Sequence, residues 1–456
     1  MIKHSITRGI APAARKTAAA DGPKRTHASV AVHRDVLANG MAVLLVPCPH
    51  LRQSYACLYF GVGSRHETPE TNGITHVLEH MLFRGTHSYK DATLLNAAAE
   101  DIGGFLEGAT YRDHLMFATG CHPSALSTAV ALLGELVTTP RYLAMEVERQ
   151  ILREEVLEGL DADGRSIDID NISHGLIFGE HGLGMCIEGP LENLERVRVP
   201  DLEAHRQRFL VGNNAVVCVA GPLHVARTVG WLDRALGGLP PGEAPLCLAP
   251  PPPQAEPIVR HVKDTGSQVD IRISFRGIPV HDPDHPALVM LGRVLADGLA
   301  SRMHAELVDR RGLAYALHAG PTTYGDCGLF EFEVAVAPRK AAEVVAAILQ
   351  FAAAAPRFRF TAAELDRVRR RYRYGTEFMA DSAADLASWH GRAALFAVET
   401  EMERLGGALA KVSTSAIHAV ARRVFRREGL VLTAVGELKR SEWREVRRIV
   451  EDWRGA

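Results

Sequence analysis

The run His76-Val77-Leu78-Glu79-His80 has the side chains and the spacing that suit a metal ion. Apolar residues at 77, 78, 81 and 82, without Gly or Pro, predict a helix here. On a helix, His76 and His80 lie one turn apart on the same face, so two imidazoles can reach one ion. Glu79 falls beside His80, where a carboxylate can accept a proton from water that the metal activates. The alternative interpretation is a pair of solvated helix histidines.

A second helix, rich in acids, is predicted from Met145 to Gly164. Its buried stripe is predicted to consist of Val147, Ile151, Leu152 and Val156. Glu148 and Glu155 are seven residues apart, two turns along one flank of that stripe. One of them could therefore supply the third protein ligand that catalytic zinc requires. The alternative is a solvated acidic face paired with Arg149 and Arg153.

The elements that position these residues belong to a chain of 456 residues, a length that predicts two domains. A Pro-rich and Gly-rich stretch, 237–257, predicts the linker between them. The two halves end alike: a helical pattern at 199–209 leads to a strand at 215–221, and one at 414–425 leads to a strand at 430–436. Strands predicted at 55–67 and 269–279 also begin each half alike. An internal duplication is therefore expected, with chance similarity of helix-turn-strand units as the alternative.

Amino-acid composition indicates which kinds of partner and which cell compartment to expect. Formal net charge is -2 and 23% of residues are charged, so no strong field attracts nucleic acid or an anionic membrane. No apolar run reaches 18 residues, so no membrane span is expected. Seven scattered cysteines without a Cys-x-x-Cys pair favour a reducing compartment, and we expect a cytoplasmic protein. The basic residues 1–30 predict a flexible tail, with an organelle transit peptide as the alternative.

Two segments together identify a family resemblance. HVLEHMLFRGT, followed about 75 residues later by ERQILREE, resembles the inverzincin metallopeptidases of the insulinase and pitrilysin family. The similarity extends over nearly all of the chain after about residue 30, and is strongest to bacterial relatives of the mitochondrial processing peptidase β subunit. It implies one zinc ion per chain, bound by His76, His80 and Glu155, with Glu79 as general base. Glu148 is implied as a further required carboxylate, and Glu154 is the alternative ligand if the alignment slips by one residue.

The resemblance also implies residues that hold a peptide substrate. Tyr315 matches a tyrosine that lies opposite the zinc in the family. The accompanying arginine is replaced by Val308, so Arg310 or Arg311 takes that role or it is absent; Arg311 is our choice. The segment 103–114 resembles the edge strand that pairs with substrate, and it carries Glu107-Gly108 where most members have Asn-Ala. Glu107 is either a contact for basic residues of the substrate or an inconsequential solvent-facing side chain.

These expectations combine into one architecture and one function. We expect an α+β protein of two homologous α/β-roll domains, at 31–236 and 258–456, each a mainly antiparallel sheet with helices on one face. The expected function is a zinc endopeptidase for short or unfolded polypeptides that pair with an edge strand. Because two-domain members resemble half of a four-domain clamshell, a homodimer or a heterodimer with a related subunit is expected. The alternative is a noncatalytic assembly subunit, although such members usually lose the pentad.

Overall fold

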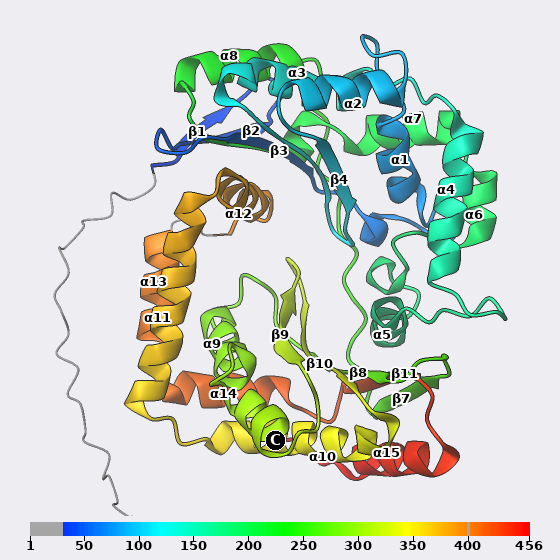
Figure 1. Ribbon diagram of the computed structural model, residues 1–456, viewed down its shortest axis with the longest axis vertical. Helices are drawn as coiled ribbons and strands as arrows, with labels where there is room; N and C mark the ends of the chain where they lie inside the picture. Colours follow the sequence, from blue (N-terminus) through cyan, green and yellow to red (C-terminus); the bar gives the residue numbers. More distant parts are fainter. Residues whose placement is uncertain (1–30, 399–401) are drawn as a thin grey trace, which may run out of the picture.

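The computed structural model describes residues 31–398 and 402–456. The basic tail predicted at 1–30 lies outside the described residues. Two β-sheets, one from each half of the chain, carry helices and face one another across the molecule (Figure 1). The predicted α+β class with two related sheets is therefore confirmed. Within the described residues no single helix is long and apolar enough to cross a membrane, and one pair, 338–357 with 362–381, meets that test only when joined across a bend of 106°.

The first sheet has six strands in the order β1-β2-β6-β3-β5-β4. Its strands are β1 (His33–Val36), β2 (Ala42–Pro47), β3 (Ser54–Phe60), β4 (Leu106–Thr110), β5 (Leu115–Cys121) and β6 (Ala215–Gly221). Only β2 and β6 run parallel, and the other neighbouring pairs are antiparallel. Among the described strands β4 pairs with β5 alone, so the other edge of β4 is free.

The second sheet repeats this arrangement with five strands in the order β7-β11-β8-β10-β9. Its strands are β7 (Ile258–Val262), β8 (Val269–Arg276), β9 (Leu317–Thr323), β10 (Gly328–Val336) and β11 (Val431–Gly436). Its parallel pair, β7 with β11, corresponds to β2 with β6, and the antiparallel pairs follow in the same order. Apart from β1, each strand of the first sheet has a counterpart, as the expected duplication requires.

The helices of the two halves follow one another along the chain in a similar order. The first half contains α1 (Ile74–Leu82), α2 (Ala92–Asp101), α3 (Leu126–Thr138), α4 (Met145–Glu158), α5 (Ile169–Phe178), α6 (Leu191–Arg196), α7 (Val199–Phe209) and α8 (Val225–Leu236). The second contains α9 (His285–Ala296), α10 (Ala341–Ala354), α11 (Ala362–Phe378), α12 (Ala383–Leu395), α13 (Met402–Lys411), α14 (Thr414–Val424) and α15 (Arg440–Asp452). The predicted helix and strand that end each half are present, within one residue of their predicted bounds.

The two halves exchange helices. α12, from the second half, packs on the first sheet, where Leu386 joins a buried cluster that contains Tyr59 and Cys218 (Figure 1). In return α5, from the first half, packs on the second sheet, where Phe178 is buried with Val431. Each sheet therefore has its own helices on one face, as expected, and a helix from the other half on the second face.

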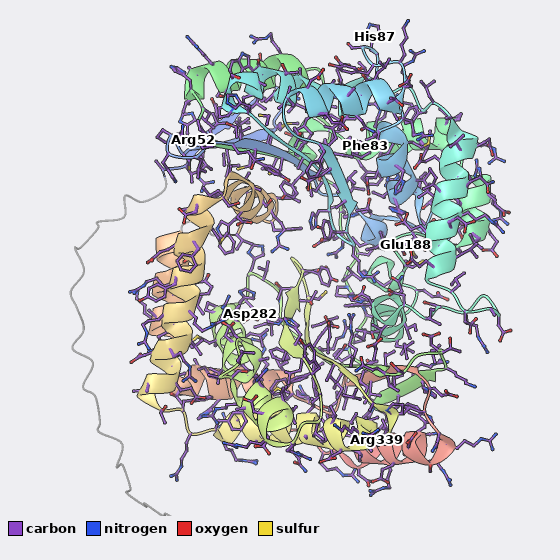
Figure 2. The ribbon with its side chains drawn as sticks, viewed as in Figure 1. Arg52, Phe83, His87, Glu188, Asp282 and Arg339 are labelled. Atoms are coloured by element: carbon purple, nitrogen blue, oxygen red, sulfur yellow. The ribbon has the colours of Figure 1, made fainter. Side chains whose placement is uncertain are left out.

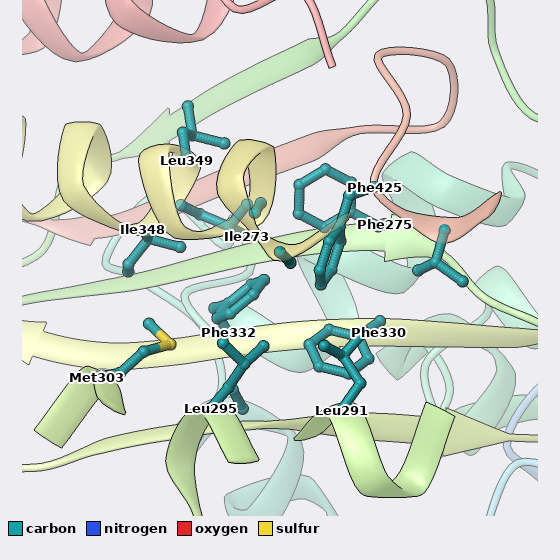
Figure 3. Close-up of a cluster of buried hydrophobic side chains, with 14 of the residues drawn as sticks. Ile273, Phe275, Leu291, Leu295, Met303, Phe330, Phe332, Ile348, Leu349 and Phe425 are labelled. Atoms are coloured by element: carbon teal, nitrogen blue, oxygen red, sulfur yellow. The ribbon is translucent and has the colours of Figure 1, made fainter. Parts of the chain in front are cut away.

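Separate apolar cores stabilise the halves. In the second half the rings of Phe275, Phe330, Phe332 and Phe425 pack together at centroid distances of 5.1–6.2 Å (Figure 3). The first half has its own cluster, in which Leu78 of α1 and Phe117 of β5 are fully buried. Residues 240–257 contain no helix or strand, and this stretch lies against the folded parts: Asn213 Nδ2 donates to the carbonyl of Gly242 at 2.7 Å.

Candidate metal centre

The start of α1 is fixed by a carboxylate and a glycine. Glu67 accepts hydrogen bonds from the backbone N–H groups of Gly73 and Thr75, at 2.8 and 2.9 Å, and so satisfies donors that the first turn leaves free. Gly73 has a left-handed φ of 96°, and a Cβ there would lie 2.5 Å from the carbonyl oxygen of Glu188. The rotation of α1, and with it the direction of its histidines, is therefore set from both sides.

α1 and α4 bring three ligand-type side chains together. His76 and His80 present their rings at a centroid distance of 4.6 Å. The Nε2 atoms of these two histidines lie 3.5 and 3.6 Å from the two carboxylate oxygens of Glu155. One ligand atom of each residue lies within 4.8 Å of the other two.

The three residues fit a zinc ion. Ligand atoms about 2 Å from one tetrahedral ion are separated from each other by about 3.4 Å. The distances from both imidazoles to Glu155 match that separation and exceed a hydrogen bond. Two imidazoles and one carboxylate are also a ligand set that suits zinc.

Glu155, and not its neighbour Glu154, belongs to this group. The predicted buried stripe of α4 is partly wrong: Leu152 and Val156 are buried, but Val147 is 54% and Ile151 48% exposed. Glu148 is buried instead, so the inward row of α4 is 148, 152 and 156, with Glu155 beside it. The alternative, in which Glu148 and Glu155 belong to a solvated face paired with Arg149 and Arg153, is wrong: these two carboxylates contact His76, His80 and Arg84, and Arg149 pairs with the exposed Glu146. Arg149 and Arg153 contact the carbonyl of Val197 and the carboxylate of Glu195.

Glu148 supports His80 from behind. His80 Nδ1 donates to Glu148 Oε1 at 2.8 Å, which fixes the tautomer that leaves Nε2 free to face Glu155. The second oxygen of Glu148 lies 3.1 Å from Arg84 Nε, so the buried carboxylate is balanced by a cation. His76 has no equivalent, since among the described residues its buried Nδ1 has no hydrogen-bond partner.

Glu79 stands beside the group on the side of strand β4. Thr110 Oγ1 donates to Glu79 Oε2 at 2.9 Å. A Cβ on Gly108 would lie 2.5 Å from Glu79 Oε1 and 2.6 Å from a ring carbon of Phe83, so the carboxylate occupies space that only glycine leaves. In Figure 2, Phe83 lies where α1 meets β4, and Glu188 lies close to α5. Glu79 is thus held close to the three ligand-type residues without being one of them.

Burial and neighbouring charges tune these groups. Burial lowers the pKa of His76 to about 3, with a further contribution from His80, so its imidazole is neutral and available as a ligand. Burial opposes protonation of His80 as well, but the hydrogen bond to Glu148 and the charges of Glu79 and Glu155 raise its pKa. Burial raises the pKa of Glu79, and burial together with the nearby carboxylates raises that of Glu155. A cation among these acids would relieve their mutual repulsion.

The predicted substrate residues lie in two places. Tyr315 is 91% exposed, and Arg310 and Arg311 pair with Glu306 and Glu343. No hydrogen bond or ion pair joins these three residues to the metal group among the described residues. Glu107 lies on β4 itself, half-buried, and accepts a hydrogen bond from Tyr55 at 3.1 Å. The structure therefore places Glu107 on the strand that contacts Glu79, but on the opposite face of the sheet, and leaves Tyr315 at the surface.

A cavity of about 660 Å³ lies between the two halves, beside the end of β4. Both halves line it, with Tyr111 and Arg112 just after β4, Thr323 of β9 and Glu331 of β10, and Phe396 after α12. Asp170 of α5, which lines the cavity, accepts hydrogen bonds from Arg112, at 2.5 Å, and from Arg272 of β8. The lining residues 111–114 follow β4 directly, so the cavity lies beyond the end of that strand.

Comparison with known proteins identifies the family. The family model described as insulinase (peptidase family M16) matches residues 42–166, and the model described as the peptidase M16 inactive domain matches residues 196–372. The chain belongs to the M16 insulinase family. The segment matched by the insulinase model contains His76, Glu79, His80 and Glu155, and the segment matched by the inactive-domain model contains most of the second sheet.

Relatives of this M16 chain carry names of zinc proteases and processing peptidases. It is 24% identical to the uncharacterized zinc protease YmxG of Bacillus subtilis, over 86% of this chain and 96% of that one. An uncharacterized zinc protease of Mycobacterium tuberculosis is 26% identical, over 94% and 99% of the two chains. A probable mitochondrial-processing peptidase subunit beta of Arabidopsis thaliana is 24% identical, over 88% and 78%.

Solved structures show the same fold. The M16 chain superposes on a protease from Helicobacter pylori with a TM-score of 0.82 at 19% identity, over 90% of this chain and all of that one. A peptidase M16 inactive domain from Pseudomonas fluorescens gives a TM-score of 0.81 at 19% identity, over 90% and 98%.

Sequence reasoning missed the residues that place Glu79 and Glu107. Thr110, Gly108 and Tyr55 contact them across strands and between a strand and a helix. One signal was available: Gly108 and Thr110 are two apart in a predicted edge strand, so they share a face. What the sequence could not supply is that this face is turned toward Glu79.

Proposed function

We propose that this protein is a zinc-dependent endopeptidase whose metal is held by His76, His80 and Glu155. The observation that carries the proposal is the convergence of both histidine Nε2 atoms on the two oxygens of Glu155 at 3.5 and 3.6 Å. Glu148 supports it by fixing the tautomer of His80. The zinc protease names of relatives that span nearly the whole chain point the same way.

The residues around the centre divide the chemistry between them. A bound zinc ion supplies a Lewis acid that polarises a carbonyl and makes water a better nucleophile at neutral pH. Glu79 accepts the proton of the attacking water and transfers it to the leaving amine nitrogen, since its carboxylate lies beside the ligands but is not one of them. Thr110 holds one carboxylate oxygen in place by donating to it, so the other stays free for the proton.

The free edge of β4 is where we propose that the peptide binds. An extended peptide added to this edge gains backbone hydrogen bonds along a strand whose Thr110 touches the general base. Only chains without competing structure can adopt that conformation. Short or unfolded polypeptides are therefore the proposed substrates.

The test of this function separates metal binding from chemistry. Glu79→Gln, loaded with zinc, should keep one zinc ion per chain and lose peptide cleavage by at least about a thousandfold, because the proton acceptor is gone. The measurements are elemental analysis and the rate of hydrolysis of a quenched fluorescent peptide. Cleavage at the wild-type rate by Glu79→Gln would contradict the proposed mechanism.

A second copy or a related subunit is the proposed partner. In the wider family, two-domain chains resemble half of a closed clamshell, and Tyr315, exposed in this chain, would then meet substrate only in an assembly. Analytical ultracentrifugation should show a dimer at micromolar concentration, whereas a monomer at every concentration would contradict it. The alternative function, a noncatalytic assembly subunit, is less well supported because the ligand group and the general base are complete.

A further inference from the structure

Glu107 and Tyr55 form a paired feature on the face of the first sheet that is turned away from α1. Glu107 lies opposite Ala118 in the ladder between β4 and β5, and Ala118 is buried with Tyr55 in the cluster under α12. Tyr55 OH donates to Glu107 Oε1 at 3.1 Å. Tyr55 is itself buried, and the charge of Glu107 adds to burial in raising the pKa of its phenol, so the phenol stays protonated and remains a donor. The carboxylate is therefore held in one position on an otherwise free strand edge.

Within the described part of the chain this carboxylate has no paired cation. Among the described residues no lysine, arginine or histidine forms an ion pair with Glu107, although it is half-buried. The nearby functional acids differ, because Glu148 contacts Arg84 and His80, and Asp170 contacts Arg112 and Arg272. A partly buried carboxylate fixed by a single neutral hydrogen bond favours an incoming cation, since one oxygen still lacks a strong donor.

The alternation of side chains along β4 determines where the Glu107 carboxylate lies relative to Glu79. Gly108 and Thr110 face α1 and contact Glu79, whereas Glu107 faces the opposite side of the sheet. A peptide strand on the free edge would lie with each side chain about 5 Å from its cross-strand neighbour on β4. The peptide residue opposite Glu107 therefore points toward Glu107, and it lies within about two residues of the bond that Glu79 addresses.

We infer that Glu107, positioned by Tyr55, is a subsite for a cationic side chain, arginine or lysine, at one fixed position of the peptide substrate. The inference rests on the proposed peptidase function. It goes further by assigning selectivity for one substrate side chain to a carboxylate of strand β4 that Tyr55 holds in place. Arginine is favoured over lysine, because its fork can engage the carboxylate with two hydrogen bonds.

Binding without turnover tests the subsite directly. In zinc-loaded Glu79→Gln protein, an arginine scan of one fluorescent template peptide, with norleucine at the same positions as reference, should show one position where arginine binds about tenfold tighter. In Glu79→Gln/Glu107→Gln protein that ratio should fall to about one, and Glu107→Lys should invert it in favour of glutamate. Tyr55→Phe should lower the ratio without abolishing it. Glu100→Gln, an exposed acid of α2, is the matched control and should leave the ratio unchanged.

Cleavage-site profiling with a peptide library completes the experiment. Wild-type enzyme should select arginine or lysine at a single position within about two residues of the cleaved bond, and Glu107→Gln should lose that selection. An equal affinity for the arginine and norleucine peptides, or a ratio that survives Glu107→Gln, would overturn the inference. If no peptide is cleaved while the binding ratio still depends on Glu107, the subsite stands and the proposed peptidase function fails.

Discussion

The orientation of His80 is set by a single neighbouring side chain, Glu148. Its Nδ1 donates to a buried carboxylate, and that bond decides which nitrogen faces Glu155. Outer carboxylates of this kind orient a histidine ligand and make it more basic. The support is unequal, because the buried Nδ1 of His76 has no partner among the described residues.

Replacement of Glu148 should weaken metal binding without removing a ligand. Glu148→Gln keeps the size of the side chain but loses the charge that polarises His80, so we expect zinc affinity to fall about tenfold. Competition with a fluorescent chelator measures it. Glu146→Gln, on the exposed side of the same helix, is the control. An unchanged affinity in Glu148→Gln would mean that the contact is structural only.

At the scale of single residues the sequence predicted part of this centre. The two histidines follow from their spacing on a helix, and that argument needs no other information. Spacing alone left Glu148 and Glu155 open between a metal site and a solvated face, and the family resemblance was needed to order them. Thr110 and Gly108 could be placed on one face of a strand but not beside Glu79, because those contacts depend on how the strand packs against α1.

Strand β4 is the element that joins the proposed peptide-binding edge to the proposed general base. One of its faces contacts Glu79 through Thr110 and the open space at Gly108, and the other carries Glu107. A change of one atom on this strand therefore reaches Glu79, the proposed general base, directly.

A methyl group at residue 108 should displace Glu79. In Gly108→Ala the new Cβ would meet Glu79 Oε1 at 2.5 Å, closer than any ordinary contact, so the carboxylate has to shift. We expect kcat to fall by at least about tenfold with little change in KM, since a misplaced base affects the chemical step. Ala109→Gly, at the neighbouring residue, is the control. Peptide hydrolysis with an unaltered kcat would show that Glu79 tolerates the shift.

At the scale of elements, the predicted buried stripe of α4 was partly wrong. The apolar residues Val147 and Ile151 were assigned to its buried stripe, yet both are about half exposed. The inward position one turn from Leu152 is taken by Glu148, which is needed to hold His80. A pattern built from apolar residues alone cannot place a stripe that includes a buried carboxylate.

The whole molecule is held together by reciprocal contacts between its halves. α5 and α12 each pack on the sheet of the other half, and Asp170 joins Arg112 of the first half to Arg272 of the second. The position of the β4–β5 turn is therefore tied to the second domain. The sequence predicted the duplication from matching helix-turn-strand ends, but not the exchange, since periodicity does not show which sheet a helix covers.

Loss of the charge on Asp170 should destabilise the protein in a pH-dependent way. Burial opposes its ionisation, but His174, Arg112 and Arg272 outweigh it and lower the pKa of Asp170 well below its usual range. A depressed pKa in the folded state stabilises above the unfolded value of about 3.9, and the contribution is lost as the pH falls. Asp170→Asn should therefore lower the free energy of unfolding by about 1 kcal/mol at pH 7, after allowance for solvent screening.

Denaturant unfolding at several pH values measures this effect. The difference between wild type and Asp170→Asn should shrink as the pH drops below about 4. Asp163→Asn, in an exposed loop, serves as the control. A difference that stays the same at pH 3 and pH 7 would exclude the ionised carboxylate as its source.

The most direct test of the metal centre compares two adjacent glutamates. Wild-type protein and Glu154→Gln should each retain about one zinc ion per chain after dialysis, measured by elemental analysis, because Glu154 lies outside the ligand group. Glu155→Gln should lose most of its zinc under the same conditions. Full zinc content in Glu155→Gln, or loss of zinc in Glu154→Gln, would contradict the centre formed by His76, His80 and Glu155.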